Sequence, residues 1–525
     1  VLLFITVGKM FKSGSKWPAR TRRNLLINKA KTSFEQYAIW AAGDSEVGGS
    51  GMNLGFNGQV PVWVAGRIIG ILDDGFVLQD ESGRMDVMVG GDEVLVGGWK
   101  IGDIVEVRIE RELSESLEGI GMIDDNLSGQ GQKSLHAQTF GGDKCLYIAK
   151  EVKVLASCQT DFFIKKGSPN YLKAVIDVNL REKLRMRTLV VNKIRDFFVK
   201  EGFMDVETPE LVSLPGMEPH LDVFKTTFRS WQERGKSGQV GGAQANTSEG
   251  AQDMYLITSP EYAMKKLLVA GYEKVFQICK SFRNKEDVSL LHNPEFTILE
   301  WYRSFASYEE IMTDTEKLVG FLCSEFRGVQ ELEFNGHKVD VSGIWERKKV
   351  KDLFAEMAGI PVADFEDVER FREAVKSKGY KVDQSTLYED LFFEVFLNEI
   401  EPKLGLKKPV IVYEYPVSMA ALSKRCEDDP RYAERFEVYI AGLELCNAFT
   451  ELNDPSEQKA RLEVEREERK KLGKEQYDID DTFIEALRFG MPPAGGVALG
   501  VDRLAMLILG IEDINDALFF PHRDL

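Results

Sequence analysis

The sequence predicts an α+β protein in which a small β-rich domain precedes a larger domain of alternating strands and helices. Two observations support this fold class. Short runs between residues 60 and 112 alternate apolar and polar residues and are separated by Gly and Asp turns. Near residue 180 the apolar spacing changes to that of a helix, and strand-like and helical segments then alternate to residue 525.

Composition indicates an ordinary globular protein. The chain has 525 residues, 43% of them apolar and 29% charged, which is enough for two or three domains with their own cores. Its six cysteines are scattered without a CxxC pair, and its five histidines are equally dispersed, so we expect reduced thiols and no zinc cluster. No apolar run is long enough for a membrane span, and the opening VLLFITV makes a poor signal peptide. We expect a cytoplasmic protein without a membrane partner.

Residues 1–57 are predicted to form a basic arm and a flexible, Gly/Ser-rich linker. A net charge of −18 disfavours an indiscriminate nucleic-acid binder. The arm is nevertheless basic, since eight cations precede the first acid, Glu35: Lys9, Lys12, Lys16, Arg20, Arg22, Arg23, Lys29 and Lys31. Both contact with RNA and a solvated tail agree with this charge.

Residues 58–160 are predicted to form a small antiparallel barrel of the OB-like type. Residues 56–130 carry fifteen acids against five bases, so the barrel is electronegative. RNA recognition, for example of tRNA, and a structural or protein-binding role therefore remain alternatives.

Residues 180–525 are predicted to form the larger domain, built on an antiparallel sheet flanked by helices. Met186, Val190, Ile194 and Phe197 share one face of a helix that ends near Gly202. The segment DVETP follows as a short strand. Residues 229–253 are rich in Gly, Ser and Gln and are predicted to be a flexible insertion.

Three segments of this domain carry candidate chemistry. The first is a predicted hairpin with six candidate residues within forty positions: Glu261, Arg283, His292, Glu295, Phe296 and Glu300. The second, RFEVYIAGLELCNAFTELND, carries Glu444, Asn447 and Glu451; because Glu444 and Glu451 are seven residues apart, a bulge or bend is needed to bring them to one face. The third, GGVALGVDRLAMLILG, places Arg503 in the first turn of an apolar helix.

These residue types suit the attack of a carboxylate on the α-phosphate of ATP. Such a step needs fixed cations against the developing phosphate charge, and Mg²⁺ needs oxygen ligands. Surplus acids would then hold a substrate ammonium removed from water. Each residue alone has a simpler explanation as a surface charge or core aromatic. The residues by themselves therefore predict only a nucleotide-using enzyme.

The same segments resemble the class II aminoacyl-tRNA synthetases. GFMDVETPEL resembles motif 1 with Pro209 as its proline, FRN…HNPEFTILEWY resembles motif 2, and GVALGVDRLAMLILG resembles motif 3. The resemblance covers residues 180–525, and ELCNAFTELND makes it lysine-type. It implies the class II catalytic fold, a homodimer, and activation of a lysine-like amino acid by ATP with Mg²⁺.

Within this group several stretches resemble the elongation factor P–(R)-β-lysine ligase more closely than lysyl-tRNA synthetase. Ala498 is the most useful position, because the ligase carries alanine where synthetases usually carry glycine. The favoured prediction is transfer of (R)-β-lysine to elongation factor P. The alternatives are a synthetase that charges tRNA with α-lysine, and an inactive synthetase-like binding or regulatory protein.

The resemblance also implies residue roles. Arg283 and Arg503 would be catalytic, and Glu444 and Glu451 would be metal ligands. Substrate-binding residues would be Ser259, Glu261, Glu300, Tyr302, Asn447, Glu451 and Ala498. ATP-binding residues would be Arg283, Asn284, His292, Asn293, Phe296, Glu444, Leu445, Gly500 and Arg503, with Phe296 and Arg503 on the two faces of adenine. Lys285, Glu286 and Leu291 depart from the usual motif 2 pattern, which puts the geometry of this loop in question.

Overall fold

The computed structural model describes residues 62–72, 75–80, 83–89, 103–113, 145–157, 168–229, 251–286, 288–420 and 422–525. The chain divides into two compact units, one ending at Gly167 and the other running from Ser168 to Leu525. The predicted arm and linker over 1–57, and nearly all of the predicted insertion over 229–253, lie outside the described residues.

Five strands of the first unit form a closed barrel in the order β1-β2-β3-β5-β4. They are β1 (Val62–Leu72), β2 (Gly75–Asp80), β3 (Gly83–Val89), β4 (Ile104–Leu113) and β5 (Cys145–Ala156). Ile68, Val105 and Val107 are fully buried. β3 and β5 pair in parallel, which corrects the expected purely antiparallel arrangement. The OB-like assignment and the RNA-binding role stay predictions.

The second unit is built on an eight-stranded sheet in the order β14-β15-β16-β17-β18-β11-β10-β6. In that order the strands are Glu346–Lys349, Val410–Pro416, Tyr432–Ile440, Leu443–Thr450, Ala494–Gly500, Glu295–Ser304, Lys274–Phe282 and Met204–Asp205. The six central strands are antiparallel as predicted. β14 and β6 join the two edges in parallel, so the sheet is mixed and not purely antiparallel.

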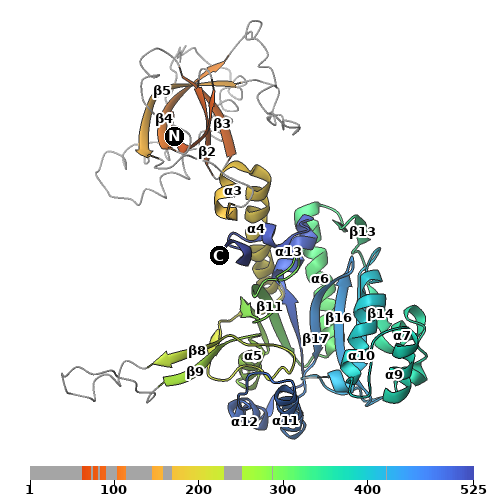
Figure 1. Cartoon of the computed structure of the whole chain (residues 1–525). Helices are drawn as coiled ribbons and strands as arrows, with labels where there is room; N and C mark the ends of the chain where they lie inside the picture. Colours follow the sequence, from red (N-terminus) through yellow and green to blue (C-terminus); the bar gives the residue numbers. More distant parts are fainter. Residues whose placement is uncertain are drawn as a thin grey trace, which may run out of the picture. The chain divides into compact units, whose positions relative to one another are not determined.

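One face of this sheet packs against three helices: α4 (Val178–Lys200), α6 (Tyr308–Arg327) and α13 (Val501–Leu509) (Figure 1). α4 is the predicted amphipathic helix. Val190, Ile194 and Phe197 are buried on it and Met186 is half-buried. The helix ends at Lys200, and Gly202 follows with a φ of 81° that favours glycine.

The remaining elements surround the sheet. The helices are α3 (Asn170–Ile176), α5 (Glu261–Val269), α7 (Val350–Met357), α8 (Val362–Phe365), α9 (Val368–Ser377), α10 (Tyr388–Val395), α11 (Pro455–Lys471) and α12 (Asp481–Gly490). The small sheets are β7 (Leu211–Val212), β9 (Ala251–Leu256) and β8 (Lys225–Arg229), and β12 (Glu331–Phe334) with β13 (His337–Asp340). Across the described part of the chain, no helix has the length and apolarity needed to cross a lipid bilayer.

Alternation along the central strands decides which side chains reach the second face of the sheet. On β11, Leu299 and Trp301 belong to the core under α4 and α6, so Ile298, Glu300 and Tyr302 point the other way. The start of α13 is fixed by Asp502, whose Oδ2 accepts from the Thr297 amide at 2.8 Å. This contact holds the first turn of α13 against β11.

Candidate active site

A cavity lies on this second face and gathers most of the predicted site residues. It is lined by Ser259, Glu261, Arg283, His292, Asn293, Phe296, Tyr302, Glu444, Leu445, Asn447, Ala498, Gly500 and Arg503. They come from α5, the β10–β11 hairpin, β17, β18 and α13. Residues of all three sequence segments thus meet at one place.

The register of β17 explains how Glu444 and Asn447 reach the same cavity. Val438 of β16 pairs with Cys446, whereas the next residue, Tyr439, pairs with Glu444. Leu445 is therefore an extra residue in β17, which is a β-bulge. The bulge changes the parity of the strand, so that Glu444 joins Asn447 on the cavity side. This is the irregularity that the sequence spacing required.

Asn284, Glu300 and Glu451 were predicted site residues but do not line the cavity. The backbone N–H of Asn284 instead donates to the backbone carbonyl of Asp222 at 2.8 Å. Glu300 is fully buried and accepts from Ser259 Oγ at 2.6 Å and from Tyr302 OH at 2.9 Å, so it lies directly behind two lining residues. Glu295, also a sequence candidate, is exposed at the start of β11.

Glu451 lies over the glycine strand β18, on the face of the sheet that carries the cavity. A Cβ at Gly496 would overlap both Glu451 Oε1 and the Tyr302 ring. Glycine is therefore required here because the strand backbone passes directly over these two side chains. Gly496 and Tyr302 both line the cavity, so the Glu451 carboxylate lies next to the cavity wall.

A buried cation lies between two of these acids. Lys265 is fully buried, with its Nζ 2.6 Å from Glu261 Oε1 and 2.5 Å from Glu451 Oε2. Burial disfavours the charged form of Lys265, but the two carboxylates outweigh burial and raise the pKa of its ammonium. The sequence interpretation missed Lys265, although its position four residues after Glu261 on α5 was a usable signal.

The acids around Lys265 outnumber it. Burial and then the charge of Glu261 raise the pKa of Glu300 to about 8. Burial also raises the pKa of Glu451, and Lys265 offsets part of that rise. Two carboxylates thus contact one resident ammonium, and the charges of both also raise the pKa of the third acid, Glu300. A substrate that brings a further positive charge would stabilise their ionised forms.

Two arginines, Arg283 and Arg503, supply positive charge elsewhere in the cavity, apart from the acids near Lys265. Arg503 Nη1 donates to the Glu444 carbonyl at 2.9 Å, and its Nη2 lies 2.8 Å from His292 Nε2. Burial, followed by the charge of Arg503, lowers the pKa of His292. The Arg283 guanidinium lies 5.1 Å from the centroid of the Phe296 ring. The arrangement can offset the charge of a polyphosphate at fixed positions.

The predicted magnesium pair does not fit this geometry. Glu444 is the second residue of β17 and Glu451 directly follows its last residue, so their backbones are roughly 20 Å apart at strand spacing. One ion with oxygen bonds of roughly 2 Å cannot contact both, and Glu451 is already bound to Lys265. The prediction failed because it used residue type without the direction of the strand.

Glu437 on β16 is the better partner for Glu444. Tyr439 pairs with Glu444 across β16 and β17, and its hydroxyl donates to Glu437 Oε2 at 2.6 Å, so the two glutamates are neighbours. Burial raises the pKa of Glu437, Arg435 offsets part of that rise, and the charge of Glu444 adds to it. Glu401 belongs to the same group, because burial and then Glu444 and Glu437 raise its pKa to about 7. Glu437 is paired with Arg435 at 2.7 Å and Glu444 with Arg503 at 3.2 Å, so the group holds three acids against two guanidinium groups. A divalent cation would offset the remaining negative charge. Glu437 lies in the same segment as Glu444 and was not singled out.

The motif 2 loop departs from the usual pattern in sequence but keeps an acid at the cavity. Lys285 adopts a φ of 57°, and its Nζ lies 3.1 Å from Asp222 Oδ1, outside the cavity lining. Glu286, one position later, lines the cavity 3.8 Å from Arg283 Nη1. Leu291 also lines it and packs against the core.

Comparison with known proteins agrees with this geometry. The family model for tRNA synthetases class II (D, K and N) matches residues 167–524. A lysine–tRNA ligase of Pelotomaculum thermopropionicum is 35% identical over 353 residues, which are 67% of this chain and 65% of that protein. One of Clostridium acetobutylicum is 34% identical over 359 residues, covering 68% and 65%. These two matches thus span just under two thirds of the relatives' length.

A longer match includes the N-terminal part of the chain. A lysine–tRNA ligase of Staphylococcus haemolyticus is 30% identical over 521 residues, which are 96% of this chain and 93% of that protein. Together with the family model, which covers the second unit almost completely, this match identifies the chain as a member of the class II tRNA synthetase family of the D, K and N type.

Proposed function

We propose that this protein is an ATP-dependent ligase that activates lysine as an aminoacyl-adenylate and transfers it to tRNA. The observation that carries the proposal is a single cavity with guanidinium groups at one part and an excess of buried acid at another. A triphosphate and a doubly cationic amino acid would bring complementary charge to these two parts. The printed names of the relatives support lysine and tRNA as substrates.

The first step joins a carboxylate oxygen of lysine to the α-phosphorus of ATP while pyrophosphate leaves. Arg283 and Arg503 would offset the charge that develops on the phosphate oxygens. Phe296 is placed on the cavity wall where it can stack on adenine. A magnesium ion, when bound, supplies further positive charge to the phosphates, and Glu444 with Glu437 would hold it. The chain's own contribution is alignment and fixed charge.

The amino groups of lysine would meet the acids around Lys265. Glu261 lines the cavity directly, and Asn447 lies on the same wall. Glu451 would act from beside Gly496 and Tyr302, and the Ser259–Glu300–Tyr302 hydrogen bonds would set the shape of this part. No covalent enzyme intermediate is required, because the mixed anhydride is reactive enough to pass lysine to a hydroxyl or amine.

The acceptor predicted from the sequence, elongation factor P, has no support from the three relatives compared above, each of which is named lysine–tRNA ligase. One observation keeps (R)-β-lysine as a second candidate substrate. Ala498 lines the cavity and is half-buried, so its methyl group takes volume from the amino-acid site. One methyl group in such a site shifts preference by about 1–3 kcal/mol. Homodimer formation through motif 1 and a tRNA contact by residues 1–160 also remain proposals.

The transfer step tests the acceptor. Purified protein, ATP and labelled lysine would be incubated with lysine tRNA or with elongation factor P, and the same pair would be repeated with labelled (R)-β-lysine. We expect lysine to appear in an alkali-labile ester on tRNA. Transfer of (R)-β-lysine to a lysine side chain, without tRNA charging, would overturn the tRNA assignment and restore the elongation factor P prediction. Absence of adenylate formation with either amino acid would favour the inactive, binding-only alternative.

A further inference from the structure

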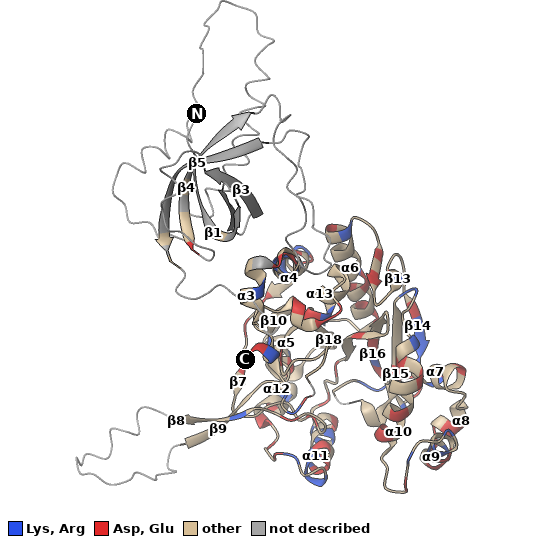
Figure 2. Ribbon diagram, turned by 45° about the horizontal axis from the view of Figure 1, so that its top comes forward, with Lys and Arg blue, Asp and Glu red and all other residues tan. Residues whose placement is uncertain are grey.

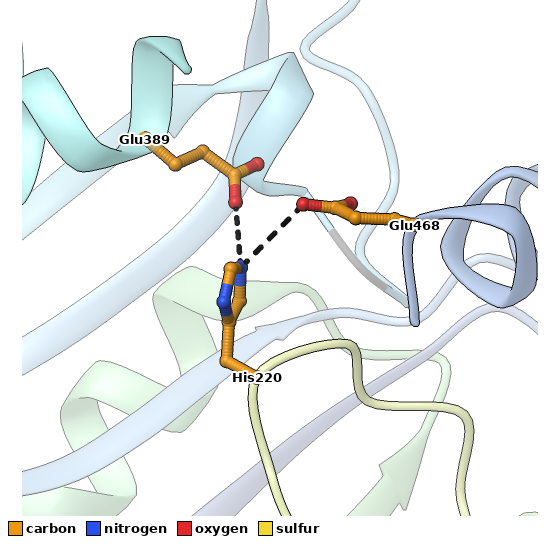
Figure 3. Close-up of side chains that lie close together, drawn as sticks. All are labelled: His220, Glu389 and Glu468. Carbon is orange, nitrogen blue, oxygen red and sulfur yellow. Dashed lines mark hydrogen bonds and ion pairs between the residues drawn. The ribbon is translucent and has the colours of Figure 1, made fainter. Parts of the chain in front are cut away.

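Three metal-ligand side chains converge outside the lining of the cavity. His220 lies in the segment between β7 and β8, Glu389 in the first turn of α10, and Glu468 on α11 (Figure 3). The dashed lines in Figure 3 meet at one ring nitrogen. His220 Nε2 is 3.1 Å from Glu389 Oε2 and 3.8 Å from Glu468 Oε1. All three ligand atoms lie within 4.8 Å of one another.

These separations match what one transition-metal ion would need. Zinc binds imidazole nitrogen and carboxylate oxygen at about 2.0–2.2 Å, usually with tetrahedral geometry. Two ligands at that distance and angle are about 3.3–3.5 Å apart. The separations of 3.1 and 3.8 Å that involve His220 lie on either side of this value. Shifts of a few tenths of an ångström would bring each carboxylate to this spacing from His220. The two carboxylates, which lie within 4.8 Å of one another, would close up by at most about 1.3 Å to complete three positions around an ion.

A further acid, Glu465, lies near the three ligand side chains and adds negative charge to the cluster. Glu465, about one turn before Glu468 on α11, has a buried Oε2 without a hydrogen-bond partner among the described residues. Burial raises the pKa of Glu465 to about 8, and the charges of Glu218, Glu468 and Glu389 contribute to that rise. Figure 2 shows both acidic and basic residues along α11, so the excess of acid is local to Glu465 and Glu468 and does not extend over the helix. A bound dication would offset this excess negative charge.

We propose that His220, Glu389 and Glu468 form a binding site for a divalent transition metal such as Zn²⁺, separate from the proposed magnesium position. A histidine nitrogen with two carboxylates favours such ions over Mg²⁺, which prefers oxygen ligands and bound water. The ligands come from three segments far apart in the sequence. A metal here therefore ties α10 and α11 to the segment that precedes β8.

This site is linked to the cavity through the chain. Glu218 lines the cavity and lies two residues before His220. The same segment is held to the loop after α11 by Lys474, whose Nζ donates to the His220 carbonyl at 2.7 Å and to Asp222 Oδ2 at 2.7 Å. A metal at His220 would add a further anchor and restrict the backbone that positions Glu218.

The test is direct metal binding by the full chain after chelator treatment, without ATP. Zn²⁺ would be titrated calorimetrically, and Co²⁺ would be followed by its visible absorption, which reports nitrogen and oxygen ligands. His220→Gln and Glu468→Gln remove one ligand each with little change in volume. His337→Ala, a half-buried histidine on β13, and Glu444→Gln, in the cavity, are matched controls.

We expect one zinc equivalent in the wild-type chain and in both controls. Loss of a ligand should weaken zinc binding by at least about 10-fold, since even outer-shell changes typically cost 10–100-fold. Equal zinc affinity in wild type and His220→Gln would overturn the proposal, as would no binding by the wild-type chain at 100-fold molar excess of zinc. If His220→Gln folds poorly, Glu468→Gln replaces it, and equal zinc affinity in wild type and Glu468→Gln would overturn the proposal.

Discussion

The most informative perturbation is Lys265→Met, which removes the ammonium between Glu261 and Glu451. Both of its ion pairs are short, and Lys265 and Glu451 are fully buried. Methionine keeps the length of the side chain but leaves Glu451 without its cation. Breaking a buried pair in this way costs about 3–5 kcal/mol if the remaining charge persists. Protonation of one carboxyl limits that cost, so the two acids will hold a proton at neutral pH.

The consequence for catalysis follows from that proton. A carboxylate that binds a substrate ammonium contributes about 1.5–3 kcal/mol, so its neutralisation should raise KM for lysine about 10- to 150-fold. KM for ATP should change little, because Arg283 and Arg503 serve the other part of the cavity. Raising the pH should restore part of the loss, since it removes the extra proton. Lysine-dependent ATP–pyrophosphate exchange measures both constants across pH.

Lys266→Met is the matched control. Lys266 is the next residue on α5, but its Nζ pairs with Asp480 at 2.7 Å and faces away from the acids. We expect wild-type KM values for this variant. An unchanged KM for lysine in Lys265→Met, or an equal rise in KM for lysine and ATP, would refute the role given to Lys265.

Three further outcomes follow. Gly496→Ala forces a methyl group onto Tyr302 and Glu451; we expect a loss of about 1–3 kcal/mol in the free energy of unfolding, measured by denaturant titration, and weaker lysine binding. A wild-type unfolding curve would count against the close approach of β18. Glu437→Gln should raise the Mg²⁺ concentration for half-maximal exchange, whereas Glu451→Gln should raise KM for lysine; the reverse pattern would reinstate Glu451 as a metal ligand. The pKa of Glu300 is raised to about 8, so its ionised form appears as pH rises through that value. KM for lysine should fall between pH 6.5 and 8, and Glu300→Gln should flatten that part of the profile; equal slopes in both proteins would exclude Glu300 as the titrating group.

Local pattern predicted the elements that carry the site. Helix α4 follows from the spacing of its apolar residues, and the β10–β11 hairpin follows from the alternation on either side of the motif 2 loop. Arg503 was expected in a first helical turn, and it is the third residue of α13. These features depend on neighbours within about one turn or one strand, which a sequence records directly.

Features that depend on distant partners were missed or misassigned. The bulge at Leu445 depends on how β17 pairs with β16, so sequence spacing could demand it but could not locate it. Glu451 was assigned to magnesium because its buried partner, Lys265, comes from a helix nearly 200 residues earlier. The parallel edge strands β14 and β6 depend on crossovers that short-range alternation does not encode.

The central claim is that one cavity joins a polyphosphate site to an ammonium site, and amino-acid-dependent ATP–pyrophosphate exchange tests it most directly. The full chain should catalyse exchange with lysine but not with norleucine, which has the same carbon chain without the terminal ammonium. Arg503→Ala should abolish that exchange. Equal exchange with lysine and norleucine, or full activity of Arg503→Ala, would contradict the account.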